Sequence, residues 1–279
     1  MLEPRNLLVK DRCFDADLGL VRPYRVPEPS APSLSIEEVL QRRTDLSTFV
    51  VHLTRDTEQG SAAANLRSII EQRRLLAGAP RGWASWEGFE LGQDVLESQR
   101  VVCFTETPLQ HVHGLFADVR GRSVHFKPYG VAFPKVIARW MAVNPVWYVD
   151  LSRAPGEWRD WPIKDALNQL VRDANGQFGE SPISRLAPFI EGMGSWPDGN
   201  GGQRVREFSW EREWRHVGTL DLAQWWSKAL WLCPEGEFDR FVPLLGDGAH
   251  VIDPSWGLER MLGHLLGMAA TEMTPFAPR

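Results

Sequence analysis

The sequence predicts an α+β fold of antiparallel-leaning strands with helices between them. Short segments rich in β-branched and aromatic residues, such as Leu46–Arg55 and Arg100–Glu106, favour strands. Longer segments with apolar residues three and four positions apart, such as Asn65–Leu76, favour helices. No repeat of fixed period is present, so a solenoid or propeller is not expected.

The first 45 residues differ from the remainder in composition. The segment VRPYRVPEPSAPS carries closely spaced prolines, which interrupt both helices and β-ladders and favour an extended path. We therefore expect two parts, a proline-rich arm over residues 1–45 and one folded domain over residues 46–279.

The strands of that domain are bounded by proline, glycine and polar turns. Thr107-Pro108 ends the strand 100–106, because proline cannot donate to a ladder. The expected strands are 46–55, 100–106, 129–133, 144–149, 207–217 and 229–233.

Helices follow from apolar spacing and from capping residues. Gly78 is expected to end the helix that begins near Ser61, and Asp253-Pro254 is expected to open the last one. In that last helix Leu258, Met261, Leu262, Leu265 and Leu266 are predicted to form one buried face. Further helices are expected at 134–141, 163–174 and 237–242, and loops at 79–98 and 192–202.

Charge and cysteine content restrict the class of function. A formal net charge of -5 argues against a protein whose main task is to bind a phosphate backbone non-specifically. The three cysteines are far apart and odd in number, which favours a reducing cytoplasm over a disulfide framework. No apolar run is long enough to span a bilayer, so no membrane partner is expected. The thirteen tryptophans favour an aromatic core over an aromatic ligand pocket.

The run Glu207-Phe-Ser-Trp-Glu-Arg-Glu-Trp-Arg215 holds the candidate chemistry. In a strand, side chains alternate between faces, so Glu211 and Glu213 are predicted to share one wall. Two neighbouring carboxylates suit a site that stabilises a positive, oxocarbenium-like centre. A solvated strand with alternating charges is the competing interpretation of this run alone.

Four short motifs carry a resemblance to known families. They are His52-Leu-Thr-Arg55, Asn65-Leu-Arg-Ser-Ile-Ile70, Cys103-Phe-Thr-Glu-Thr-Pro108 and Glu211-Arg-Glu-Trp-Arg215. Over about residues 46–222 the chain resembles the AbiGi-type abortive phage resistance proteins. The order of its polar residues is similar to that of ADP-ribosyltransferases, particularly the DNA-targeting toxins.

That resemblance implies a mixed, mainly antiparallel split sheet with flanking helices, and NAD as the substrate. Glu213 then stabilises the ribosyl cation and Glu211 prepares the acceptor, which is a macromolecule or water. His52, Thr54, Arg55 and Asn65 are implied as NAD-binding residues. The middle strand adds Thr105 and Thr107. The biological expectation is a toxin-type effector in anti-phage defence.

Two alternatives remain open. The same fold could serve as a non-catalytic antitoxin that binds a partner protein in a defence system. A metal-dependent nuclease would need His111 and His113 as ligands with Glu106 nearby, but no third ligand is convincing, and no metal is expected.

Overall fold

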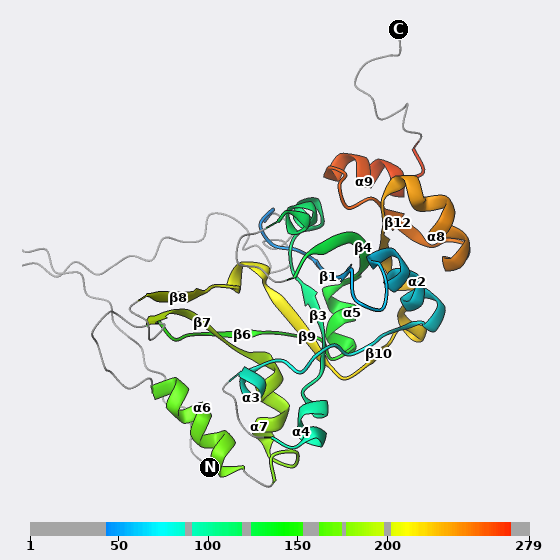
Figure 1. The fold of residues 1–279 in the computed structure, drawn as a ribbon. Helices are drawn as coiled ribbons and strands as arrows, with labels where there is room; N and C mark the ends of the chain where they lie inside the picture. Colours follow the sequence, from blue (N-terminus) through cyan, green and yellow to red (C-terminus); the bar gives the residue numbers. More distant parts are fainter. Residues whose placement is uncertain are drawn as a thin grey trace, which may run out of the picture. The chain divides into compact units, whose positions relative to one another are not determined.

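The computed structural model describes residues 43–86, 91–118, 124–152, 162–174, 177–197 and 202–268. The chain divides into two units, residues 1–42 and residues 43–279. Nearly all of the predicted arm, residues 1–45, lies outside the described residues. The second unit is a mixed α/β structure with a mainly antiparallel sheet and several helices (Figure 1).

A seven-stranded sheet organises the described part of this unit. Its order is β12-β11-β4-β1-β3-β9-β5. All neighbours are antiparallel except β11 and β12. The strands are β1 (Phe49–Arg55), β3 (Val101–Thr105), β4 (Phe126–Pro134), β5 (Asn144–Pro145), β9 (Glu213–Val217), β11 (Leu230–Leu232) and β12 (His250–Ile252).

Alternation along β1 sends its side chains into two cores. Val50 packs with Leu66 and Phe104 on one face of the sheet, whereas Val51 packs with Leu115 on the other. The first face is covered by α2 (Ala62–Gln72), α5 (Lys135–Trp140) and α8 (Phe238–Leu245). The second is covered by the 3₁₀ helix η1 (Leu109–Phe116) and by α9 (Leu258–Leu265).

A second, three-stranded sheet lies beside β9 and has a core of its own. It consists of β6 (Trp147–Asp150), β7 (Ile190–Pro197) and β8 (Gln203–Arg206) in the order β6-β7-β8. Its core residues come also from α3 (Trp83–Trp86), α6 (Pro162–Asp173), α7 (Pro182–Leu186) and η2 (Ala187–Phe189). The indole of Trp83, fully buried here, donates to Asn168 Oδ1 at 3.0 Å.

Several sequence predictions were wrong in this region. The segment 79–98, expected as a loop, contains α3 and α4 (Gln93–Ser98). The segment 192–202 was also expected as a loop because of its glycines, but residues 192–197 belong to β7, and residues 198–201 lie outside the described residues. Pairing across the β7–β8 hairpin overrides the low strand propensity of glycine there.

The first helix ends earlier than predicted. Ser61 caps α2 by accepting a hydrogen bond from the amide of Ala64, and Arg73, with φ 51°, ends it in the left-handed conformation. The next two residues form β2 (Arg74–Leu75), which pairs with β10 (Leu220–Asp221). Pairing with a distant segment therefore ends this helix before Gly78.

The last helix does not bury the predicted apolar face. Of the five residues expected inside, Met261 is buried, whereas Leu262 is 51% and Leu266 78% exposed. The short α9 rests on the sheet mainly through Met261, in the same core as Trp256. Its other leucines therefore form an apolar surface.

The described tryptophans divide between core and surface. Trp83, Trp214, Trp231 and Trp256 are buried, whereas Trp140, Trp147 and Trp210 are exposed. In the remaining connections, β10 leads into the 3₁₀ helix η4 (Ala223–Lys228), and η5 (Glu235–Glu237) precedes α8. No helix in the described ranges is both long and apolar enough to cross a membrane.

Candidate functional site

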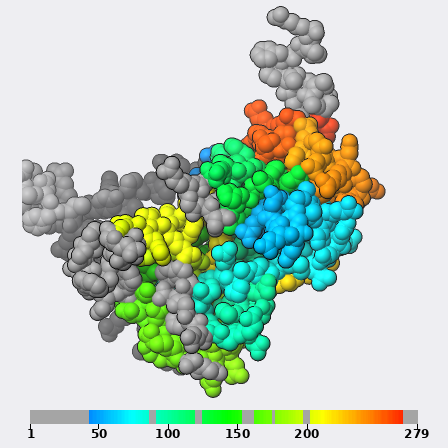
Figure 2. All heavy atoms as spheres, in the orientation of Figure 1, coloured from blue at the N-terminus to red at the C-terminus, as the bar shows by residue number. Residues whose placement is uncertain are grey.

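A cavity of about 730 Å³ opens beside the junction of β1 and β3. The register of these two strands contains one pair, Val51 opposite Thr105. Next to this pair, Nδ1 of His52 forms a hydrogen bond with the carbonyl oxygen of Cys103 at 2.8 Å. In a regular antiparallel ladder a backbone amide would occupy that place. The cavity is lined by residues of α2, of the β2–β3 segment and of the β8–β9 segment. Figure 2 shows these segments in blue, cyan and yellow on one face of the molecule.

The two candidate glutamates reach this cavity in a way that the sequence did not predict. Residues Ser209–Glu211 form the 3₁₀ helix η3, Arg212 is left-handed with φ 48°, and β9 begins at Glu213. The prediction of one strand through residues 207–215 was therefore wrong in its first half. Glu211 and Glu213 nevertheless both line the cavity, because a turn rather than strand alternation brings them to one wall.

A buried carboxylate holds this turn. Glu106, directly after β3, accepts from Arg212 Nη2 at 2.8 Å and from the indole of Trp214 at 2.8 Å, and it pairs with Lys135 at 2.5 Å. Its backbone amide donates to the carbonyl of Arg212 at 3.0 Å. These contacts fix the left-handed residue that turns the chain from η3 into β9.

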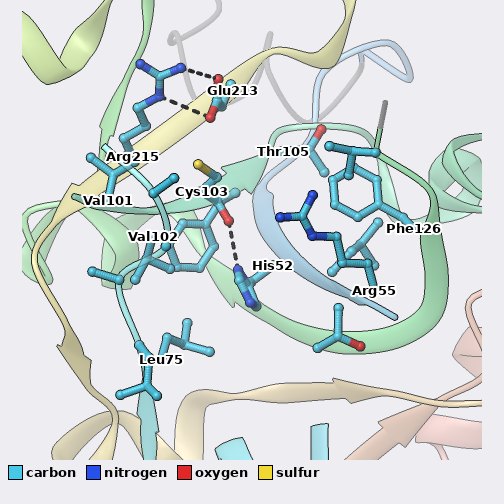
Figure 3. Close-up of a pocket in the computed structure, with 18 of the residues that line it drawn as sticks. His52, Arg55, Leu75, Val101, Val102, Cys103, Thr105, Phe126, Glu213 and Arg215 are labelled. Carbon is cyan, nitrogen blue, oxygen red and sulfur yellow. Dashed lines mark hydrogen bonds and ion pairs between the residues drawn. The ribbon is translucent and has the colours of Figure 1, made fainter. Parts of the chain in front are cut away.

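Glu213 is joined to a buried arginine. Its two carboxylate oxygens accept from Nε and Nη2 of Arg215 at 3.0 and 2.8 Å (Figure 3). The Arg215 side chain is 2% exposed, while that of Glu213 is 17% exposed at the cavity wall. Burial lowers the pKa of Arg215, but the adjacent Glu213 and Glu191 carboxylates outweigh it, so the net pKa is raised and the guanidinium remains charged.

The surroundings of Glu213 include a thiol and a phenol. Cys103 lies opposite Arg215 in the register of β3 and β9. Burial, together with the nearby Glu213 carboxylate, raises the pKa of the Cys103 thiol, so this cysteine is not an activated nucleophile. The amide of Glu213 donates to the Tyr148 hydroxyl at 3.0 Å.

His52 faces the same cavity as a neutral imidazole. Burial lowers its pKa, against the opposing effect of the hydrogen bond to the Cys103 carbonyl. Because that carbonyl can only accept, Nδ1 carries the proton and Nε2 is left as an acceptor. Arg55, at the exposed end of β1, extends into the cavity near Thr105 and Phe126 (Figure 3).

The side chains of Thr54 and Asn65 form hydrogen bonds to backbone carbonyls around the cavity. The buried Thr54 hydroxyl lies 2.9 Å from the carbonyl of Ala62 and 3.2 Å from that of Tyr129. The Asn65 amide donates to the carbonyl of Arg55 at 2.8 Å, which ties the first turn of α2 to the end of β1. Both residues line the cavity, and the oxygen of the Asn65 amide remains an acceptor there.

The two threonines of the middle strand have different positions. Thr105 lies opposite Glu213, and its hydroxyl donates to the carbonyl of Glu211 at 2.5 Å. Thr107 lies away from the cavity wall and donates to the Thr105 hydroxyl at 2.8 Å. The pair therefore orients the turn that carries Glu211.

Two further charged residues, Glu191 and Arg206, line the cavity and were not expected from the sequence. Glu191 lies on β7, directly after the segment 184–190, whose local pattern is ambiguous, and it is only 6% exposed. It accepts from Arg215 at 2.8 Å and from Arg206 at 2.7 Å. Only the packing of the second sheet against β9 brings these charges together, so no local sequence signal could have indicated them.

The described residues include no cluster of side chains that would support the metal-dependent nuclease. His111 and His113 lie in η1, which is a helix rather than a strand, and Glu106 is engaged by two cations. Among the described residues, no group of three or more His, Cys, Asp or Glu side chains could hold a metal ion.

Comparisons of the chain with models of protein families, with curated proteins and with solved structures found no match.

Proposed function

We propose that this protein binds NAD in the cavity beside β1 and β3 and breaks its nicotinamide–ribose bond. The observation that carries the proposal is that Glu211 and Glu213 line one cavity with His52, Arg55 and Asn65, which come from a distant part of the chain. Its volume of about 730 Å³ lies within the range of small-molecule sites. The proposal includes an ADP-ribosyltransferase-like fold, supported by the mainly antiparallel sheet and the single pair that joins β1 to β3.

In this reaction the glycosidic C–N bond breaks and its electron pair leaves with nicotinamide. Positive charge develops on the ribose, and the Glu213 carboxylate at the cavity wall stabilises that charge in the transition state more than in the ground state. Water or a hydroxyl or amine of a macromolecule then bonds to the anomeric carbon. Glu211 accepts the proton that this nucleophile loses.

The remaining residues either contact NAD or hold the contacting residues in place. The Nε2 of neutral His52 accepts from a ribose hydroxyl or from the carboxamide of nicotinamide. Arg55 carries a guanidinium that suits the diphosphate, because it can form two parallel hydrogen bonds to phosphate oxygens. Thr54, Asn65, Thr105 and Thr107 act mainly by holding these groups in place.

We further propose that the protein serves as a toxin-type effector in anti-phage defence, where consumption of NAD or modification of a macromolecule stops an infected cell. This part rests on the resemblance of the four motifs around His52, Asn65, Cys103 and Glu211. The cytoplasm is the corresponding compartment.

Release of nicotinamide from NAD by the purified protein tests the activity. Glu213→Gln keeps the shape of the side chain and removes its charge, and we expect it to lower the rate by about 100- to 1000-fold, the cost of losing one transition-state contact. Glu235→Gln, which alters an exposed ion pair with Arg260, should keep the wild-type rate. A rate that is equal in Glu213→Gln and wild type would overturn the proposal.

A non-catalytic partner-binding role is the second candidate, and the apolar surface of α9 favours it. Leu258, Leu262 and Leu266 are 49%, 51% and 78% exposed, and such clusters are typical of protein-binding surfaces. If this role holds, Glu213→Gln will preserve the effect of the protein on cells, whereas Leu262→Glu will abolish it. If the enzyme role holds, the result will be the reverse.

A further inference from the structure

We infer that Glu191 is a positioning residue, which holds the catalytic carboxylate of Glu213 in place through Arg215. The inference rests on the proposed function and adds a residue to it. Glu191 lies on β7 of the second sheet, whereas Arg215 and Glu213 lie on β9 of the main sheet. A residue outside the catalytic strand would thus set the geometry of the reaction.

The charges form one continuous chain. Arg206 Nη2 donates to Glu191 Oε1 at 2.7 Å, and Arg215 Nη2 donates to Glu191 Oε2 at 2.8 Å. The same Arg215 nitrogen donates to Glu213 Oε2 at 2.8 Å, and Nε donates to Oε1 at 3.0 Å. Two cations and two anions therefore alternate from the cavity rim at Arg206 to Glu213.

Hydrogen bonds on several sides fix the orientation of the Arg215 guanidinium. Its Nη1 donates to the carbonyl of Pro188 at 2.6 Å, so the guanidinium is held on three sides, by β7, by η2 and by Glu213. It is also 2% exposed, and water cannot replace a lost partner easily. The orientation of the guanidinium plane in turn fixes both oxygens of Glu213.

Glu191 is needed because of charge as well as shape. Its side chain is 7% exposed and lies between two guanidinium groups, whose mutual repulsion it offsets. In Glu191→Gln one carboxylate oxygen becomes an NH₂ group, which must face one of the two guanidinium donors. Arg215 then loses a partner or shifts, and Glu213 moves with it.

The test combines steady-state kinetics with hydrogen exchange. We expect Glu191→Gln to lower kcat for nicotinamide release by about 10- to 100-fold, since small displacements of reacting groups have effects of this size. KM for NAD should change by less than about twofold, because Glu191 contributes through geometry rather than binding. The Nε–H of Arg215, assigned by its loss in Arg215→Lys, should exchange faster with solvent in Glu191→Gln.

Asn168→Ala is the matched control for a general loosening of the second sheet. It removes the partner of the Trp83 indole in the same small core and leaves the charge chain intact, so it should keep the wild-type kcat. A wild-type kcat in Glu191→Gln, or an unchanged exchange rate of the Arg215 Nε–H, overturns the inference. If the wild-type protein releases no nicotinamide, the proposed function fails, and the exchange measurement alone decides whether Glu191 positions Arg215.

Discussion

A neutral histidine in the cavity makes folding sensitive to pH. Burial lowers the pKa of His52, so between its folded value and the unfolded value of about 6.5 the unfolded chain binds more protons than the folded one. The free energy of unfolding therefore falls as pH falls below about 6.5. Burial lowers the pKa of His216 as well, which adds to the same slope.

We expect His52→Gln to reduce this pH dependence while His216 retains its part. Urea unfolding at several pH values between about 5 and 8 measures the slope directly. His113→Gln, a change in the exposed part of η1, should keep the wild-type slope. If the pH dependence of the free energy of unfolding is the same in His52→Gln and wild type, His52 binds protons equally in the folded and the unfolded protein.

At the scale of elements, the β1–β4 pairing supports the cavity. Gly130 on β4 lies opposite Leu53 on β1 and opposite Leu232 on β11, in the middle of the sheet. A Cβ atom at this position would approach the carbonyl oxygen of His52 to 2.1 Å. That backbone belongs to the residue whose ring bonds Cys103, so any shift there reaches the site.

We expect Gly130→Ala to destabilise the protein by about 1–3 kcal/mol, the usual cost of overpacking, or more if β1 cannot move. Gly114→Ala is the control, because a Cβ atom there meets nothing within 4 Å. Chemical denaturation of both variants gives the comparison. Equal stability of the two variants would mean that β1 and β4 can move apart enough to accept the methyl group without lowering the free energy of unfolding.

Some elements follow their local sequence pattern, and others depart from it. The strand β1 and the helix α5 follow the local pattern of residues and lie close to where the sequence places them. The run around Glu211 does not, because Arg212 is held in a left-handed turn by Glu106, a residue far away in the chain. Periodicity describes a segment, whereas this turn depends on a contact between segments.

At the scale of the whole molecule, ligand binding should couple to stability. If NAD occupies the cavity, it binds the folded state only and raises the free energy of unfolding by about 2.7 kcal/mol at a concentration 100 times its Kd. We expect this increase in Glu213→Gln, which under the proposed function should still bind NAD but turn it over slowly. Thermal denaturation at increasing NAD concentration measures it, and adenine alone serves as the control ligand. An unchanged Tm at saturating NAD would argue against NAD in this cavity.

Local pattern sufficed for the mixed α/β character and for most strands of the main sheet, because propensity and apolar spacing are encoded by neighbouring residues. The cavity residues of β1 and α2 were expected instead from the resemblance of their motifs to known families. The tertiary structure was needed for the turn between Glu211 and Glu213, for the exposed face of α9 and for the chain of charges through Glu191 and Arg215. A buried ion pair between two sheets depends on which segments pack together, and that information is spread over the whole chain.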